Sequence, residues 1–266
     1  MAQGNVVTAW IPERLWRTGD ARVHSYPLMS NPAGILGIIA FYLLFALKLG
    51  PAFMRKRGPL NITLIMVTYN AAMVILSIYF FTLTVKFAYV KSGYNIVCQG
   101  NDSQTNPAVH VMIYHGWCYL MLKMAELLDT VFFVLRKKSA HVSFLHLLHH
   151  SLALWTVWLA LHFVISGQVS LFPLLNSCVH VVMYTYYGLA ALGLYEYLWW
   201  KKYVTQFQIV QFAVLAVHSA IPFIVDCGFP KSFALLMMMN ASLFLVLFSH
   251  FYYGTYIQPR VRSKVH

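Results

Sequence analysis

Three histidines stand within five residues of a strongly apolar part of the chain. His146, His149 and His150 are flanked by apolar sequence at 142–145 and 151–164, which is typical of a membrane-spanning helix. On an α-helix, the spacing i, i+3, i+4 places the three imidazoles within about 100° of one face. Ionisable side chains are costly inside a bilayer and generally mark a functional site there. Because neutral imidazole is a base and a nucleophile near pH 7, the motif predicts acid–base or covalent chemistry.

The rest of the chain has the composition of a multi-pass membrane protein. Of its 266 residues, 60% are hydrophobic and 10% are charged, and the mean hydropathy is +0.64. A soluble domain of this length cannot bury that much apolar surface. Segments of about 18 or more apolar residues can each cross a hydrocarbon core of about 30 Å. The sequence predicts an all-α protein with seven transmembrane helices, at residues 33–54, 62–90, 108–135, 142–165, 168–193, 203–225 and 231–256.

Basic residues are clustered in alternate loops, which predicts the orientation of these helices. They are Arg55, Lys56, Arg57, Arg136, Lys137, Lys138, Lys201, Lys202, Arg260, Arg262 and Lys264. Because basic loops are retained in the cytosol, the clusters predict a lumenal or external N-terminus and a cytosolic C-terminus. The chain then divides into a lumenal segment at 1–32, a transmembrane catalytic domain at 33–256 and a cytosolic basic tail at 257–266.

Two cysteines fall in loops on the non-cytosolic side of this topology. Cys98 lies between the second and third segments, and Cys227 follows the sixth. A disulfide can persist on that side, so the two are a candidate bridge, with two unrelated small apolar side chains as the alternative. The sequon Asn101-Asp102-Ser103 lies in the loop of Cys98, but it is close to the membrane and we do not expect its use.

Unusual polar residues of four predicted helices fall at one depth. With a rise of about 1.5 Å per residue, His149 and His180 both lie about 12 Å from the cytosolic face. Lys123, Glu126 and Asp129 lie about 18, 13 and 9 Å from the cytosolic end of the third segment by the same rise. The layer is completed by Asn176, Tyr184, Tyr187, Gln208 and Gln211. Scattered polar residues would not coincide in depth, so the layer indicates a site.

Some members of this layer also have a structural interpretation. Lys123, Glu126 and Asp129 could form an ion-pair network that orients helices. Gln208 and Gln211 could join helices by hydrogen bonds as readily as they could contact a substrate. These alternatives remain open from the residues alone, whereas the shared depth favours a functional role for His180.

Three classes of protein fit the histidine cluster. Membrane di-iron desaturases and hydroxylases carry a similar box but need several boxes, and a single zinc or iron site that includes His180 remains open. A seven-helix receptor, channel or transporter fits the topology, but the polar layer is unlike an ordinary ligand pocket. Acyl transfer through imidazole is favoured, because no cysteine is placed to compete as the nucleophile. Cys118 lies about 25 Å from the cytosolic end of its helix, and Cys178 points nearly opposite to His180.

Four motifs make the chain resemble the very-long-chain fatty acid elongases, the ELO family of 3-ketoacyl-CoA synthases. Their order and spacing match from about residue 30 to 256. The motifs are Lys123-Met-Ala-Glu-Leu-Leu-Asp129-Thr130, Phe144-Leu-His-Leu-Leu-His-His150, Asn176-Ser-Cys-Val-His180-Val-Val-Met-Tyr184-Thr-Tyr-Tyr187 and Thr205-Gln-Phe-Gln208-Ile-Val-Gln211. One departure is His141, where many members have Gln or Asn, and this difference could bear on substrate preference.

The resemblance implies an acyltransferase of the endoplasmic reticulum membrane, with its N-terminus in the lumen. Acyl-CoA and malonyl-CoA would give 3-oxoacyl-CoA, CoA and CO2, with no cofactor and no metal. For this reaction our hypothesis is that His149, assisted by His180, takes the acyl group, and that His146 and His150 orient the site, stabilise the oxyanion or move protons. The alternative is a ternary complex in which histidine is only a base. The expected partners are the bilayer, the two CoA substrates and the ketoacyl reductase, dehydratase and enoyl reductase of the elongation cycle, but no nucleic acid. A homodimer is a further candidate.

Cations at the predicted cytosolic mouth suit the phosphates of CoA. They are Arg136, Lys137, Lys138, Lys201 and Lys202. The alternative is that these charges serve the topology alone, and both roles are compatible. A fatty chain needs a long dry tunnel, which we expect to run from the polar layer toward the lumenal end.

Overall fold

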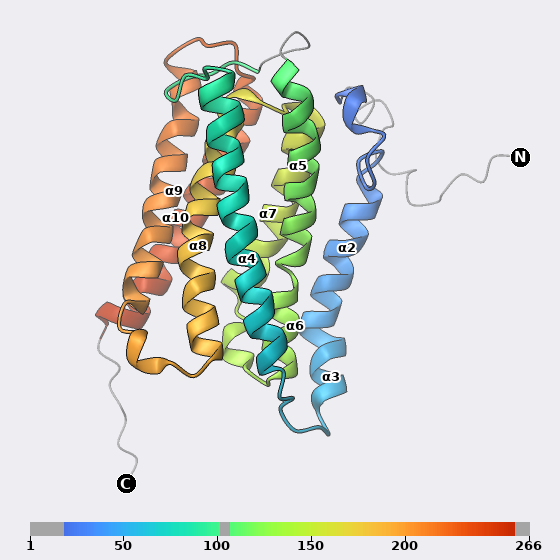
Figure 1. Cartoon of the computed structure of the whole chain (residues 1–266), viewed down its shortest axis with the longest axis vertical. Helices are drawn as coiled ribbons and strands as arrows, with labels where there is room; N and C mark the ends of the chain where they lie inside the picture. The colour runs from blue at the N-terminus through green and yellow to red at the C-terminus, as the bar shows by residue number, and fades with distance from the viewer. Residues whose placement is uncertain (1–18, 102–106, 259–266) are drawn as a thin grey trace, which may run out of the picture. The chain divides into compact units, whose positions relative to one another are not determined.

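All regular secondary structure is helical in the part of the chain that the computed structural model describes, residues 19–101 and 107–258 (Figure 1). No β-strand occurs in these ranges. Long helices follow from the sequence, because a backbone in lipid must satisfy its hydrogen bonds within its own segment. Several predicted features lie outside the described residues: the tail cations Arg260, Arg262 and Lys264, and Asp102 and Ser103 of the sequon.

The helical elements follow the order of the predicted segments (Figure 1). The first half comprises η2 (Ala21–Val23), α2 (Ala33–Leu44), η3 (Phe45–Leu49), α3 (Gly50–Met54), α4 (Thr63–Thr84), η4 (Val85–Lys91), α5 (Pro107–Ala125), α6 (Leu128–Leu135) and η5 (Ser139–His141). The second half comprises α7 (Phe144–Phe163), η6 (Gly167–Ser170), α8 (Leu171–Ala191), η7 (Tyr195–Tyr197), α9 (Lys201–Ala220), η8 (Ile221–Phe223), α10 (Lys231–Tyr252) and η9 (Tyr253–Ile257). The elements η3, η4 and η9 are π-helical turns that continue an α-helix.

Six helical segments within the described ranges are long and apolar enough to cross a membrane. They are Ala33–Met54, Thr63–Lys91, Phe144–Phe163, Gly167–Ala191, Lys201–Phe223 and Lys231–Ile257. Each corresponds to one of the seven predicted segments. The remaining segment, 108–135, is also helical, but a turn at Glu126 and Leu127 divides it into α5 and α6. Its histidines and Lys123 dilute its apolar residues, so it does not meet the same test of hydropathy.

The chain divides into two compact units, and each contains some of the predicted site residues. The first unit comprises Met1–Ile62, Thr82–Ser170 and Cys227–Pro230, and the second comprises Thr63–Phe81, Leu171–Asp226 and Lys231–His266. In the first unit, α7 packs against α2 and α5, and α3 packs against α6. In the second, α9 packs against α8 and α10. We describe each unit by itself.

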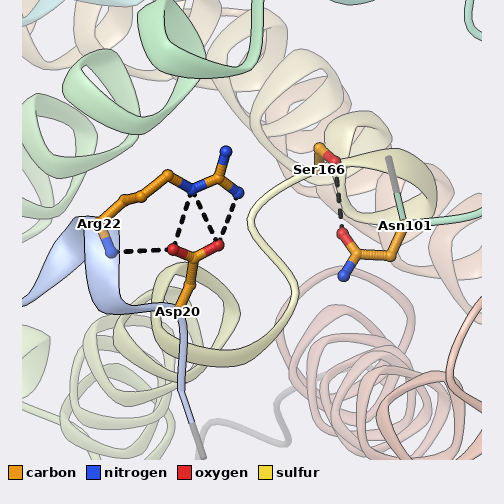
Figure 2. A network of polar contacts seen from close by, with 4 residues as sticks. All are labelled: Asp20, Arg22, Asn101 and Ser166. Carbon is orange, nitrogen blue, oxygen red and sulfur yellow. Dashed lines mark hydrogen bonds and ion pairs between the residues drawn. The ribbon is translucent and has the colours of Figure 1, made fainter. Parts of the chain in front are cut away.

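Tryptophan side chains attach the segment that precedes α2 to the rest of the first unit. Trp158 of α7 donates to the carbonyl of Leu28 over 2.9 Å, and Trp117 of α5 donates to that of Pro27 over 3.1 Å. Asp20 pairs with Arg22 at 2.6 Å (Figure 2). The hydrogen bond from Arg22 lowers the pKa of the Asp20 carboxyl below its ordinary value. Polar contacts therefore join residues 20–28 to α5 and α7.

A disulfide and a buried glutamine join three loops of the first unit. Cys98 is bonded to Cys227, the pair singled out from the sequence, with Cα atoms 5.8 Å apart. Gln168, only 2% exposed, accepts a hydrogen bond from the Gln99 backbone N–H at 2.9 Å. Its amide donates to the Val97 carbonyl at 3.2 Å. Figure 2 shows a neighbouring contact in the same loops, in which the Ser166 hydroxyl donates to Asn101.

Gly167 is placed where only glycine fits, which gives a test of this loop packing. Its φ is +78°, and a Cβ there would overlap the carbonyl oxygen of Gly100. Gly93 has a φ of +63° but has open space around it. We expect Gly93→Ala to cost about 1 kcal/mol of folding free energy from backbone conformation alone. Gly167→Ala should cost about 2 kcal/mol more, because the loops must also separate.

Melting temperatures of the two variants in detergent measure the difference directly. The matched pair shares the left-handed backbone, so an equal loss of stability in both would contradict the close packing of Gly167 against Gly100.

Candidate active site

The histidine cluster lies in the first two turns of α7. Ser143 caps this helix, and its hydroxyl accepts a hydrogen bond from the His146 backbone N–H at 3.2 Å. The cap starts the helix at Phe144, so the register places His146, His149 and His150 along one side. The ring centroids of His146 and His150 are 4.4 Å apart, and those of His149 and His150 are 5.4 Å apart. The structure thus brings the three imidazoles together as the spacing predicts.

Burial differs among the three imidazoles. His150 is only 8% exposed, whereas His146 and His149 are half-buried. His146 and His149 are therefore more accessible than His150.

An ion pair is buried at the end of α5. Lys123 Nζ lies 2.6 Å from Glu126 Oε1, and the two side chains are 2% and 1% exposed. Both charges are within electrostatic range of His150. Asp129, 5% exposed, stands in the first turn of α6, where the helix dipole favours an anion, and it is within electrostatic range of Lys123. Lys123 and Glu126 therefore lie near the buried His150, and Asp129 lies near Lys123.

Two hydroxyl residues join this cluster that the sequence did not single out for a role. Thr130 Oγ1 lies 2.7 Å from His146 Nε2, and Tyr42 OH lies 2.8 Å from Thr130 Oγ1. Thr130 is fully buried, and Tyr42 is 5% exposed. Thr130 closes the motif that begins at Lys123, which is the one sequence signal that pointed to it. Tyr42 is a tyrosine in an apolar helix, and no spacing argument connects it with the motif.

The second unit holds the other predicted polar residues in a cluster of its own. Asn176 Nδ2 lies 3.1 Å from His180 Nε2, one turn along α8. The ring of Tyr184 lies 5.5 Å from that of His180 and 6.0 Å from that of Tyr187. Asn176, His180 and Tyr184 are buried, and Tyr187 is half-buried. The stripe predicted along α8 is thus a contiguous set of contacts.

Two residues of α9 belong to the same unit. Gln208 is half-buried and donates to the sulfur of Met183 at 3.5 Å. Gln211 is 4% exposed. Polar amides at these depths are costly to bury, so both are candidates for contact with a polar part of a substrate.

The predicted CoA-binding cations lie at helix ends in both units. Lys137 and Lys138 are exposed just beyond α6, and Lys201 and Lys202 are exposed at the start of α9. Arg136 is half-buried. Lys137 adopts a left-handed φ of 54° and ends α6, because the Lys138 N–H bonds the Phe133 carbonyl at 2.8 Å. This turn fixes the backbone from which two of the cations project.

Candidate metal ligands do not converge in the described part of the chain. Among residues 19–101 and 107–258, no three His, Cys, Asp or Glu side chains form a group that could hold a metal ion. The fold and these clusters define an α-helical, multi-pass membrane protein with a histidine cluster beside a buried ion pair.

Comparison with known proteins identifies the family. The family model "ELO: GNS1/SUR4 family" matches residues 27–264. Human "Very long chain fatty acid elongase 4" is 40% identical over 247 residues, which cover 92% of this chain and 78% of that protein. Rat "Very long chain fatty acid elongase 7" is 40% identical, covering 93% and 89%, and mouse "Very long chain fatty acid elongase 1" is 38% identical, covering 92% and 89%. The chain belongs to the ELO family, as its motifs predict.

Proposed function

We propose that this protein is the condensing enzyme of very-long-chain fatty acid elongation. In this reaction acyl-CoA and malonyl-CoA give 3-oxoacyl-CoA, CoA and CO2. The observation that carries the proposal is the histidine cluster beside the buried Lys123–Glu126 pair in a chain whose relatives are named as elongases. No metal or organic cofactor is needed, because the imidazoles can supply nucleophile and base.

The first half-reaction transfers the acyl group to the enzyme. An unprotonated nitrogen of His149 attacks the thioester carbonyl, the carbon–sulfur bond breaks, and CoA leaves as a thiol after it gains a proton. The half-buried position of His149 supports this role, and His180 assists. His146 and His150 orient the ring, move protons or stabilise the oxyanion. Lys123, Glu126 and Asp129 set the electrostatic field of the cluster.

The second half-reaction forms the new carbon–carbon bond. Malonyl-CoA binds and loses CO2, and the resulting enolate attacks the acyl carbon while the bond from that carbon to His149 breaks. The product is two carbons longer, and the imidazole is regenerated. Side chains of the second unit are hydrogen-bond candidates for the substrates: Asn176, Tyr184, Tyr187, Gln208 and Gln211.

The topology that suits this function has seven spans, with α5 and α6 together as the third. The N-terminus is then lumenal and the C-terminus cytosolic, in the membrane of the endoplasmic reticulum. The Cys98–Cys227 disulfide supports this orientation, because it requires an oxidising compartment for its loops. The exposed cations at the other ends of the helices support it through the positive-inside rule.

CoA binds at the cytosolic mouth through Arg136, Lys137, Lys138, Lys201 and Lys202. Their charge complements the phosphates of CoA, and the acyl chain extends into the apolar interior. The other enzymes of the cycle, the ketoacyl reductase, dehydratase and enoyl reductase, are the expected partners, and a homodimer is a further candidate assembly.

A trapping experiment tests the covalent step. Purified protein incubated with acyl-CoA alone should release CoA in an amount equal to the enzyme and gain the mass of one acyl group. His149→Ala should do neither, whereas His110→Ala, which changes an exposed histidine of α5, should behave as wild type. Chain extension without any acyl-enzyme in the first incubation would replace this mechanism by a ternary complex with histidine as base.

A further inference from the structure

A chain of two buried hydroxyl groups ends on His146. It starts at Tyr42 of α2, passes through Thr130 of α6 and reaches the first turn of α7, so three helices of the first unit contribute one residue each. The two links are 2.8 and 2.7 Å long, and both hydroxyl residues are almost fully buried. A buried hydroxyl without a partner is costly, so this chain is not an incidental contact.

The acidity of the two hydroxyls indicates the order of donors. A phenol is a stronger hydrogen-bond donor than an aliphatic alcohol, so Tyr42 donates to Thr130. The single proton of the Thr130 hydroxyl is then directed to His146 Nε2. A neutral imidazole that accepts at Nε2 carries its hydrogen on Nδ1, so the chain selects one of the two tautomers of His146.

Close packing of α3 against α6 keeps the hydroxyl chain aligned. Gly50 of α3 approaches Val134 of α6 so closely that a Cβ on Gly50 would lie 2.7 Å from a methyl carbon of Val134. Gly50 is two turns beyond Tyr42, and Val134 is one turn beyond Thr130. Phe133 also packs against His146, with ring centroids 5.4 Å apart. The imidazole is thus in contact with both the hydroxyl chain and Phe133.

We propose that Thr130 and Tyr42 are positioning residues that set the tautomer and ring orientation of His146 for the condensation. This inference rests on the proposed elongase function. It goes beyond the histidine motif, because Tyr42 lies outside all four motifs that carry the resemblance.

Steady-state extension assays on four variants test the proposal. We expect Thr130→Val to lower kcat about 10- to 100-fold with little change in KM for acyl-CoA, because a reacting group is misplaced while the substrate site is kept. Thr130→Ser, which keeps the hydroxyl, should stay within about threefold of wild type. Tyr42→Phe should lower kcat about fivefold, as expected for one hydrogen bond. Tyr89→Phe removes the hydroxyl of another tyrosine of the first unit and should be silent.

Non-additivity separates positioning from a merely structural role. Because Tyr42 acts only through Thr130, the double variant Tyr42→Phe/Thr130→Val should be no slower than Thr130→Val alone. If Thr130→Val does not fold, as judged by its melting temperature, comparison of Tyr42→Phe with Thr130→Ser still tests the hydroxyl chain. Tyr42→Phe removes one hydroxyl oxygen from it, whereas Thr130→Ser removes none.

Two contrary results are distinguishable. In the first, the wild type is active, but Thr130→Val and Tyr42→Phe both stay within about threefold of its activity, or the effects of the two changes multiply in the double variant. Either outcome would overturn this inference alone. Inactivity of the wild type with every acyl-CoA would overturn the elongase function on which the inference rests.

Discussion

His149→Ala is expected to abolish malonyl-CoA-dependent chain extension. Removal of a nucleophile from a group that acts as a unit lowers turnover by about 10³-fold or more. The neighbouring rings are less suited to replace the half-buried His149, because His150 is buried and His146 is engaged by Thr130. Incorporation of radiolabelled malonyl carbon into lipid measures the loss.

His110→Ala and the melting temperature serve as controls for this result. The variant at His110 should retain wild-type turnover, and His149→Ala should unfold close to the wild-type temperature because its ring is not fully buried. Retention of more than about a tenth of wild-type turnover by folded His149→Ala would contradict the assignment of the nucleophile.

Glu126→Gln is expected to destabilise the protein strongly. Glu126 and Lys123 are buried and 2.6 Å apart, so the substitution removes the carboxylate that lies against the buried Lys123 ammonium. Breaking such a pair typically costs about 3–5 kcal/mol of folding free energy. Arg22→Met, which breaks the partly exposed Asp20–Arg22 pair of equal length, should cost less than about 1 kcal/mol. Thermal unfolding in detergent compares the two.

The double variant Lys123→Met/Glu126→Met separates stability from chemistry. Replacement of a buried ion pair by apolar side chains is often neutral, so the double variant should regain most of the stability lost by Glu126→Gln. This double variant should nevertheless be inactive in chain extension, because the charges of Lys123 and Glu126 both act on His150. Wild-type activity in this variant would show that Lys123 and Glu126 only orient helices.

Much of the helical framework could be predicted from hydropathy. Six of the seven predicted segments coincide with helices that could span a membrane, and their ends agree within a few residues. Apolar runs predict helices well in this setting because lipid leaves the backbone no other way to satisfy its hydrogen bonds. The third segment differs, because Glu126 occupies a turn between α5 and α6, and a period of three along a helix does not predict such a break.

The site was predictable where its residues follow helix spacing. The contacts among His146, His149 and His150, and the pairing of Lys123 with Glu126, follow from the positions i, i+3 and i+4. The contact of Tyr42 with Thr130 spans 88 residues and depends on how closely α3 approaches α6 at Gly50. Such approach distances are set by packing between helices, on which the periodicity of a single sequence carries no information.

Incorporation of radiolabelled malonyl-CoA by the purified protein, with a panel of acyl-CoAs and with and without a chelator, tests the elongase function most directly. We expect extension of the acyl chain by two carbons, and this activity should survive the chelator and disappear in His149→Ala. No incorporation with any acyl-CoA, or activity that the chelator removes, would contradict a metal-free condensing enzyme built on this histidine cluster.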